Sequence, residues 1–100
     1  MLHTVNKSPF ERTALAACLR YARDGDAVLL YEDGVYAARK AAATTPDVAA
    51  AAGRLRMFVL GPDLAARGVA ADQVIDGIGI VDYGGFVDLV AENAPVQAWL

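Results

Sequence analysis

The sequence predicts an α/β fold, a single-domain three-layer sandwich in which helices cover both faces of a four- or five-stranded, mostly parallel sheet. Short apolar runs such as 27–31 (AVLLY) and 56–60 (RMFVL) are typical of parallel strands buried on both faces. Segments with helical spacing of apolar residues separate these runs, and this alternation indicates parallel crossover connections. No internal repeat or low-complexity linker divides the chain, so we expect one domain over residues 1–100.

The stretch 27–38 (AVLLYEDGVYAA) organises the rest of the chain. Its apolar run predicts a central strand, and Glu32, Asp33 and Gly34 predict a tight turn into a short helical segment that reaches about Lys40. The carboxyl ends of central strands in an open α/β sheet border the crevice where ligands bind, so we expect polar residues there to matter most.

The N-terminal segment predicts a strand followed by a helix. Residues 1–5 (MLHTV) form the expected first strand. Ser8, Pro9 and Glu11 have the spacing of a capping box with proline at the first helical position, which predicts a helix from Pro9 to about Arg23 that Gly25 closes. Its apolar stripe, with Cys18 at the edge, consists of Leu15, Leu19 and Ala22.

Two further helices are predicted on either side of the third strand, 56–60. Thr45 is placed to cap an alanine-rich helix that begins with Pro46 and ends before Gly53. After the strand, 61–63 (GPD) starts a short helix that Gly68 stops.

The C-terminal third predicts short strands and a last helix. Residues 74–75 form a brief strand and 78–81 a firmer one. Asp82 then caps a helix that ends before Pro95, and the apolar tail 96–100 (VQAWL) docks on the domain. The apolar face of this helix has i, i+3, i+4 spacing and consists of Phe86, Leu89 and Val90.

Composition favours an oligomer in an aqueous compartment. Apolar residues make up 56% of the chain before glycine is counted, against roughly 45–50% with glycine in typical soluble domains. No apolar run approaches the ~18 residues of a membrane span, and the N-terminus lacks the pattern of a signal peptide. We therefore expect no membrane association, and we expect part of the apolar excess to face partner subunits.

Charge and cysteine content exclude several function classes. The net charge is −3 and the nine basic residues are scattered, so direct nucleic-acid binding is not expected. A single cysteine excludes an internal disulfide and a cysteine-based metal cluster, and it favours a reducing cytoplasm. The glycines at 77, 79, 84 and 85 form neither a dinucleotide fingerprint nor a phosphate loop, so we expect no cofactor and no metal.

Cys18 is the one potential nucleophile of consequence. As a persulfide carrier it needs a thiolate and solvent access. As a structural residue it needs neither, because cysteine is among the most buried residue types and a mid-helix position does not lower its pKa. Both interpretations remain open at this point.

Other polar and aromatic candidates have plain structural interpretations beside the functional ones. Glu32 and Asp33 are a metal site or a solvated turn, and Asp82 is a phosphoacceptor of the receiver type or a helix cap. His3 is a base or a hydrogen-bonded structural residue, and the lack of a Ser, Cys or acidic partner at motif spacing favours the structural interpretation. Trp99 is either core packing or an interface anchor.

Five segments together resemble the DsrH/TusB family over essentially all of the chain: LHTVNKSPF, EDGVYAA, VLGPDLAARG, VDYGGFVDL and QAWL. The match is closest to the DsrH branch, which is associated with sulfur oxidation, whereas the TusB branch serves sulfur relay to the 2-thiouridine of tRNA wobble positions. The resemblance implies a Rossmann-like fold of the DsrEFH type. It further implies a heterohexamer with DsrE/TusD-like and DsrF/TusC-like subunits.

In such a complex, the resemblance implies that the DsrE-like subunit bears the principal persulfide cysteine and passes sulfur to a DsrC/TusE-like acceptor. DsrH-branch members have a cysteine on the first helix, and Cys18 is that residue here. We therefore predict a partner-dependent sulfurtransferase subunit, not catalytic alone, with Cys18 as a secondary sulfur site and Trp99 and Leu100 at an interface. The alternatives are a purely structural or regulatory subunit, a stand-alone thiol carrier, and a receiver-like phosphoprotein.

Overall fold

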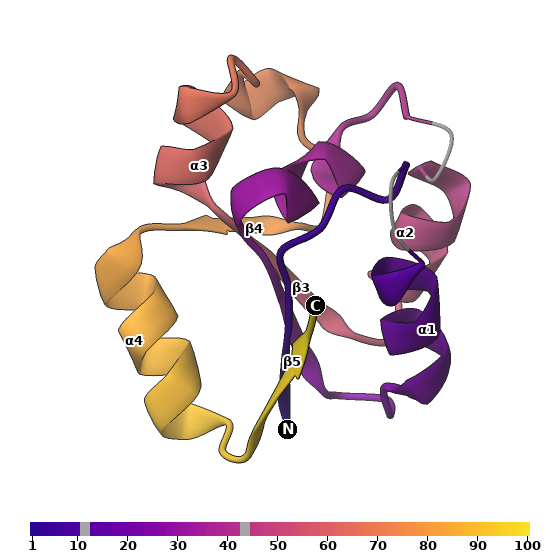
Figure 1. Cartoon of the computed structure of the whole chain (residues 1–100), viewed down its shortest axis with the longest axis vertical. Coiled ribbons are helices and arrows are strands. Elements are labelled where there is room, and N and C mark those ends of the chain that lie inside the picture. Colours follow the sequence, from indigo (N-terminus) through magenta and orange to yellow (C-terminus); the bar gives the residue numbers. More distant parts are fainter. Residues whose placement is uncertain (11–12, 43–44) are drawn as a thin grey trace.

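The computed structural model describes residues 1–10, 13–42 and 45–100. Its centre is a five-stranded sheet in the order β4-β3-β2-β1-β5 (Figure 1). All four pairings of the described sheet are parallel, so the predicted α/β fold with a mostly parallel sheet is confirmed. The strands are β1 (Leu2–Val5), β2 (Ala27–Leu30), β3 (Arg56–Leu60), β4 (Gly79–Val81) and β5 (Val96–Trp99).

Helices cover both faces of this sheet, as predicted, but unequally. They are α1 (Ala14–Tyr21), α2 (Thr45–Ala51), α3 (Gly61–Ala66) and α4 (Tyr83–Glu92), with 3-10 segments η1 (Glu32–Ala38) and η2 (Ala71–Gln73). In Figure 1, α4 lies on one side of the sheet, and α1 and α2 lie on the other. None of the helices in the described ranges is long and apolar enough to cross a membrane.

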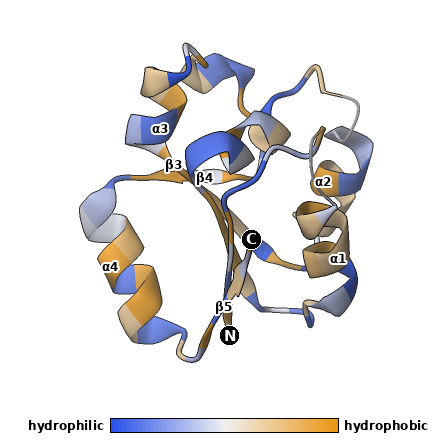
Figure 2. Cartoon of the chain, viewed as in Figure 1, coloured by the Kyte–Doolittle hydropathy of each residue, from blue (hydrophilic) through white to orange (hydrophobic). Residues whose placement is uncertain are grey.

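Alternate strand residues feed two separate cores. Val28 and Leu30 of β2 belong to the larger core with α1, α2, α3 and η1, whereas Ala27 and Leu29 belong to a smaller core with Leu89 of α4. All four residues of β2 are buried, because both of its faces are covered. The hydropathy colouring in Figure 2 shows the same pattern, with hydrophobic residues along the strands and on α4.

The turn after β2 depends on Gly34. A Cβ atom at this position would lie 2.2 Å from the carbonyl oxygen of Val5 at the end of β1. The amide of Tyr31 donates to the same oxygen at 3.1 Å. Glu32 has a φ of 48°, in the left-handed region, and its amide donates to the carboxylate of Asp63 at 2.6 Å. The predicted turn and short helical segment are present, and the turn packs closely against the end of β1.

The predicted start of the first helix is wrong. α1 begins at Ala14, although the Ser8 hydroxyl does accept the amide of Phe10 at 3.2 Å within a turn. Glu11, the other half of the predicted capping box, lies outside the described residues. A helix gains most of its stability from packing an apolar face, and the buried face of α1 begins only at Leu15.

The predicted end of that helix is also too late. α1 ends at Tyr21, and Ala22 is already extended with a ψ of 139°. Gly25 has a φ of 87°, and its amide donates to the carbonyl of Arg54 at 2.8 Å, so it serves the turn into β2 instead of closing the helix.

Thr45 is the first helical residue of α2 rather than its cap. Its hydroxyl donates to the carbonyl of Arg39 at 2.7 Å and accepts the amide of Ala42 at 3.0 Å. The side chain therefore fastens the preceding loop. β3 and α3 have the predicted positions, and Gly68 follows α3 with a φ of 69°.

The C-terminal third differs from the prediction in three places. Val74 forms an isolated bridge to Arg39 in place of a strand, and η2 precedes it. Asp82 caps α4 as predicted, because its carboxylate accepts the amide of Gly85 at 2.8 Å, but Val90 stays 38% exposed. The tail is not merely docked: it forms the strand β5 along β1.

We expect Gly34→Ala to destabilise the chain by about 2–4 kcal/mol, because the added methyl group overlaps the backbone of β1 and one of the two segments must move. Urea denaturation followed by circular dichroism measures this difference. Gly53→Ala is the matched control, since its Cβ would come no closer than 3.3 Å to another atom, and it should change the stability by less than ~1 kcal/mol. Equal effects of the two substitutions would contradict the role of the close approach.

Candidate functional site

Cys18 lies at the centre of the larger core and not at its edge. The residue is fully buried on α1 and shares its cluster with Val5, Val28 and Met57 of the three central strands. The parallel register pairs Val28 with Met57, so these two side chains lie on the same face of the sheet as α1 and belong to the same core as Cys18. In the isolated chain, reagents reach the thiol only if α1 moves.

The electrostatic surroundings of Cys18 keep its thiol protonated. Burial raises the pKa of the Cys18 thiol to about 12; the negative charge of Asp26 adds to the rise, and the positive charge of Arg54 opposes it. The thiolate is the nucleophilic form, so only a minute fraction of this cysteine is reactive at neutral pH. Uptake of sulfur on Cys18 therefore requires a change in its surroundings.

The last turn of α1 is fastened by Arg54. One guanidinium nitrogen of Arg54 donates to the carbonyl of Ala22 at 2.9 Å, and another donates to the carbonyl of Leu19. The same side chain lies 3.4 Å from a carboxylate oxygen of Asp24. A cation at the C-terminal end of a helix also stabilises its dipole, so Arg54 stabilises the last turn of the helix that carries Cys18.

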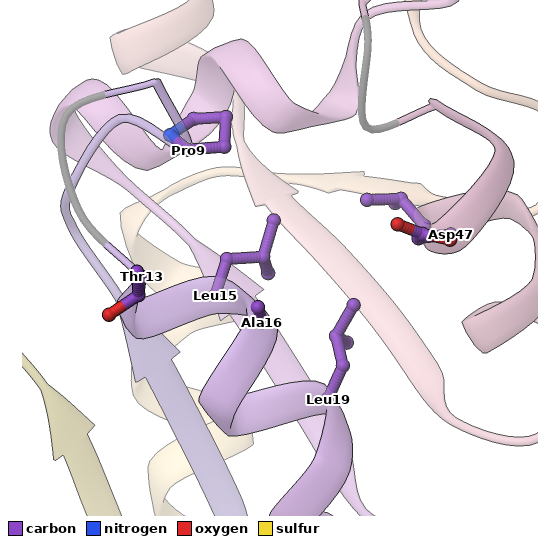
Figure 3. Close-up of a pocket in the computed structure, with 7 residues that line it drawn as sticks. Pro9, Thr13, Leu15, Ala16, Leu19 and Asp47 are labelled. Atoms are coloured by element: carbon purple, nitrogen blue, oxygen red, sulfur yellow. The ribbon is translucent and has the colours of Figure 1, made fainter.

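A small apolar pocket of about 140 Å³ lies between α1 and α2 (Figure 3). Leu15, Ala16 and Leu19 line it from α1, and Asp47 and Val48 line it from α2. Cys18 is not among its lining residues. The pocket therefore gives no direct route to the thiol, and its size suits only a few ligand atoms.

Asp33 after β2 and Asp82 after β4 have structural partners. Asp33 pairs with Arg67 at 3.0 Å, and Asp82 is used as the helix cap of α4. Within the described ranges, no group of three or more metal-ligating side chains comes together. The helix-cap interpretation of Asp82 is confirmed, and the geometry gives no support to a receiver-like phosphoacceptor site.

His3 has an acidic partner that sequence reasoning missed. Its Nε2 lies 2.9 Å from a carboxylate oxygen of Asp26, and its Nδ1 accepts a hydrogen bond from the indole of Trp99 at 3.2 Å. Tyr21 packs edge-on against both rings, with centroids 6.0 Å from His3 and 5.6 Å from Trp99. Parallel pairing of Leu2 with Ala27 brings these residues together. The short apolar runs that begin directly after Met1 and Asp26 are the one sequence signal for this pairing.

The two predicted interface residues lie in different environments. Trp99 packs half-buried against the larger core, whereas Leu100 is 76% exposed. An interface role for either residue stays a prediction. Among the described residues, α4 also carries exposed large apolar side chains, and Tyr83 is 62% and Val87 66% exposed.

Comparison with known proteins gives one family and a consistent set of relatives. The model of the family described as DsrH like protein matches residues 7–96. Proteins named Protein TusB from Erwinia tasmaniensis and Pectobacterium parmentieri are 41% and 36% identical to the chain over 99 residues, which is 99% of this chain and 100% of each relative. Protein TusB of Escherichia coli K12 is 36% identical over the same span.

Solved structures show the same fold at low sequence identity. The ychN protein from E. coli has a TM-score of 0.78 with 14% identity, and the similarity covers 97% of both chains. MTH1491 from Methanobacterium thermoautotrophicum, a protein of unknown function, has a TM-score of 0.76 with 20% identity over 97% of this chain and 95% of its own.

We expect iodoacetamide to modify Cys18 of the native chain at pH 8 at least ~100-fold more slowly than in the urea-unfolded chain, because the folded thiol is both covered and mostly protonated. Mass spectrometry of timed samples measures both rates. The unfolded chain is its own control, since it carries the same single thiol. Comparable rates in the two states would show that α1 leaves Cys18 open.

Proposed function

The chain belongs to the DsrH family, which implies a role in sulfur relay for tRNA thiolation, and we propose that it performs this role as a partner-dependent subunit of a sulfurtransferase complex. The observation that carries the proposal is the alignment with Protein TusB of Erwinia tasmaniensis, which spans 99% of this chain at 41% identity. That relative is matched over its entire length, so the similarity concerns a whole subunit rather than a shared motif.

The exposed apolar surface of α4 supports a subunit role. Of the ten residues of α4, all described, Leu89 is buried, while Tyr83, Val87 and Val90 are exposed apolar side chains at i, i+4, i+7 spacing. This spacing places the three on one side of the helix. Gathered apolar side chains on a surface indicate a protein interface. Figure 2 shows hydrophobic residues on α4 beyond its first turn.

We propose that the partners are DsrE/TusD-like and DsrF/TusC-like subunits in a heterohexamer in the cytoplasm. In this arrangement the DsrE-like subunit carries the principal persulfide, and a DsrC/TusE-like protein accepts the sulfur. The chain then contributes surface rather than chemistry to the main transfer. That division of labour agrees with the buried thiol of Cys18 and its raised pKa.

Cys18 has two possible roles inside such a complex. As a secondary sulfur site, its thiolate would attack the outer sulfur of a partner's persulfide; the donor S–S bond breaks, a new S–S bond forms on Cys18, and the donor leaves as a thiolate. As a structural residue, Cys18 only fills the core beneath α1. Its full burial favours the structural role.

Replacement of the chain in cells that lack it tests the proposal. Wild-type chain should restore 2-thiouridine in tRNA, measured by mass spectrometry of nucleosides, and should co-elute with its partner subunits. Cys18→Ala should restore both as well if the thiol is structural, whereas loss of thiolation with intact assembly would make Cys18 a sulfur site. Ala is preferred to Ser, because a hydroxyl in this apolar core costs about 1–3 kcal/mol. Failure of the wild-type chain to restore thiolation would refute the proposed function.

We expect Leu100→Ser to weaken co-elution with the partner subunits while the fold of the chain stays intact, because Leu100 is exposed and contributes little to the core. Deletion of Trp99 and Leu100 together should weaken assembly further. Size-exclusion chromatography of mixed subunits measures both. An undiminished full complex with Leu100→Ser would remove Leu100 from the interface.

A further inference from the structure

The C-terminal strand is fastened to the sheet by a buried side-chain contact in addition to its backbone ladder. Trp99 of β5 donates its indole Nε1–H to Nδ1 of His3 on β1 at 3.2 Å. The His3 side chain is fully buried, and Tyr21 of α1 packs edge-on against both rings. This contact therefore joins both termini of the chain and the end of α1.

The hydrogen bond of Trp99 sets the tautomer of the neutral imidazole, that is, which ring nitrogen carries the proton. An indole nitrogen is only a donor, so Nδ1 of His3 must present its lone pair. The proton of the neutral ring then lies on Nε2, which donates to Asp26 at 2.9 Å.

Asp26 stays ionised throughout the pH range in which histidine side chains change their charge. The hydrogen bond from His3, a backbone amide and the N-terminal ammonium group hold the pKa of Asp26 down at about 2, against the opposing effect of burial. The carboxylate lies 3.3 Å from the ammonium nitrogen and accepts the amide of Arg23 at 3.0 Å. Histidine changes its charge between about pH 5 and 8, where Asp26 therefore remains a fixed acceptor.

A second proton on His3 has no place in the docked arrangement. It would bind at Nδ1 and face the indole N–H of Trp99 as a second donor, 3.2 Å away and out of contact with water. The attraction between Asp26 and an imidazolium ring favours that second proton, and the Trp99 contact opposes it. We propose that His3 and Trp99 form a proton-operated latch, in which protonation of His3 and docking of β5 exclude each other.

The other charged and titratable groups near the latch come from α1, from the segment before β3 and from the N-terminus. On α1, Tyr21 packs edge-on against the imidazole ring of His3. Cys18, also on α1, has its pKa raised to about 12 by burial and by the negative charge of Asp26. Arg54, from the segment before β3, is permanently positive and also acts on Cys18. The N-terminal ammonium group interacts with Asp26 on the side away from Trp99.

The chain provides its own reporters for a test, since His3 is its one histidine and Trp99 its one tryptophan. We expect the full chain, taken from pH 8 to pH 5, to show a red shift of Trp99 fluorescence. Over the same range, hydrogen exchange of the indole N–H and of the β5 amides should become at least ~10-fold faster after correction for the intrinsic effect of pH. NMR should show protonation of the His3 ring with the same midpoint, while the β2 and β3 amides keep their protection.

Two variants assign the transition. His3→Gln keeps the N-terminal ammonium group but cannot titrate, so its Trp99 signals should not change with pH. In Trp99→Phe, which keeps an aromatic ring but lacks the donor, the His3 ring should become protonated at a higher pH than in the wild type, because no hydrogen bond then opposes the proton. This second measurement decides the matter even where His3→Gln does not fold.

Three results would overturn the latch. His3 could become protonated with Trp99 and β5 unchanged, which would show no coupling. The β2 and β3 amides could lose protection in the same transition, which would make it global unfolding. His3 could also stay unprotonated down to pH 5, in which case no proton operates the contact.

Discussion

The central position of β1 is the constraint on which the rest of this structure depends. β1 pairs in parallel with β2 on one side and with β5 on the other, so the first strand of the chain lies between its neighbour in sequence and its last strand. Hydrogen bonds fill both edges of the strand, and side chains cover both faces; Leu2, Val5 and the residues between them are all buried. Both edges of β1 are therefore paired only when segments from the two ends of the chain meet.

The same arrangement explains why the thiol of Cys18 is buried. α1 connects β1 to β2 and must cross directly over them, which buries its inner face, Cys18 included. Arg54, in the segment between α2 and β3, donates to the carbonyl of Ala22 directly after α1 and so stabilises the end of that helix. A sulfur carrier requires an accessible thiolate, and Cys18, which is fully buried and has a raised pKa, does not provide one in this arrangement.

The two faces of the sheet are covered to different extents. One side carries the larger core and is closed by several helices. On the other, within the described residues, α4 packs on a small core through Leu89 and leaves Tyr83 and Val87 in water. A domain of this size has little interior to spare, so apolar residues in excess of its core remain outside. The closed side holds most of the buried core, and the half-open side is where we propose that partner subunits bind.

The sequence alone determined the elements whose signals are local: the parallel α/β class, the buried strands 27–30 and 56–60, the Asp82 cap and the short turn through Gly34. Periodicity, capping and turn chemistry act over a few neighbouring residues, so they can be read without the fold. Tertiary structure decided the strand at 96–99, the late start of α1 and the full burial of Cys18. It also decided the contacts of His3 with Asp26 and Trp99. Each of these depends on which distant segments pair and what they cover, and that choice is made by burial across the whole domain rather than by any local pattern.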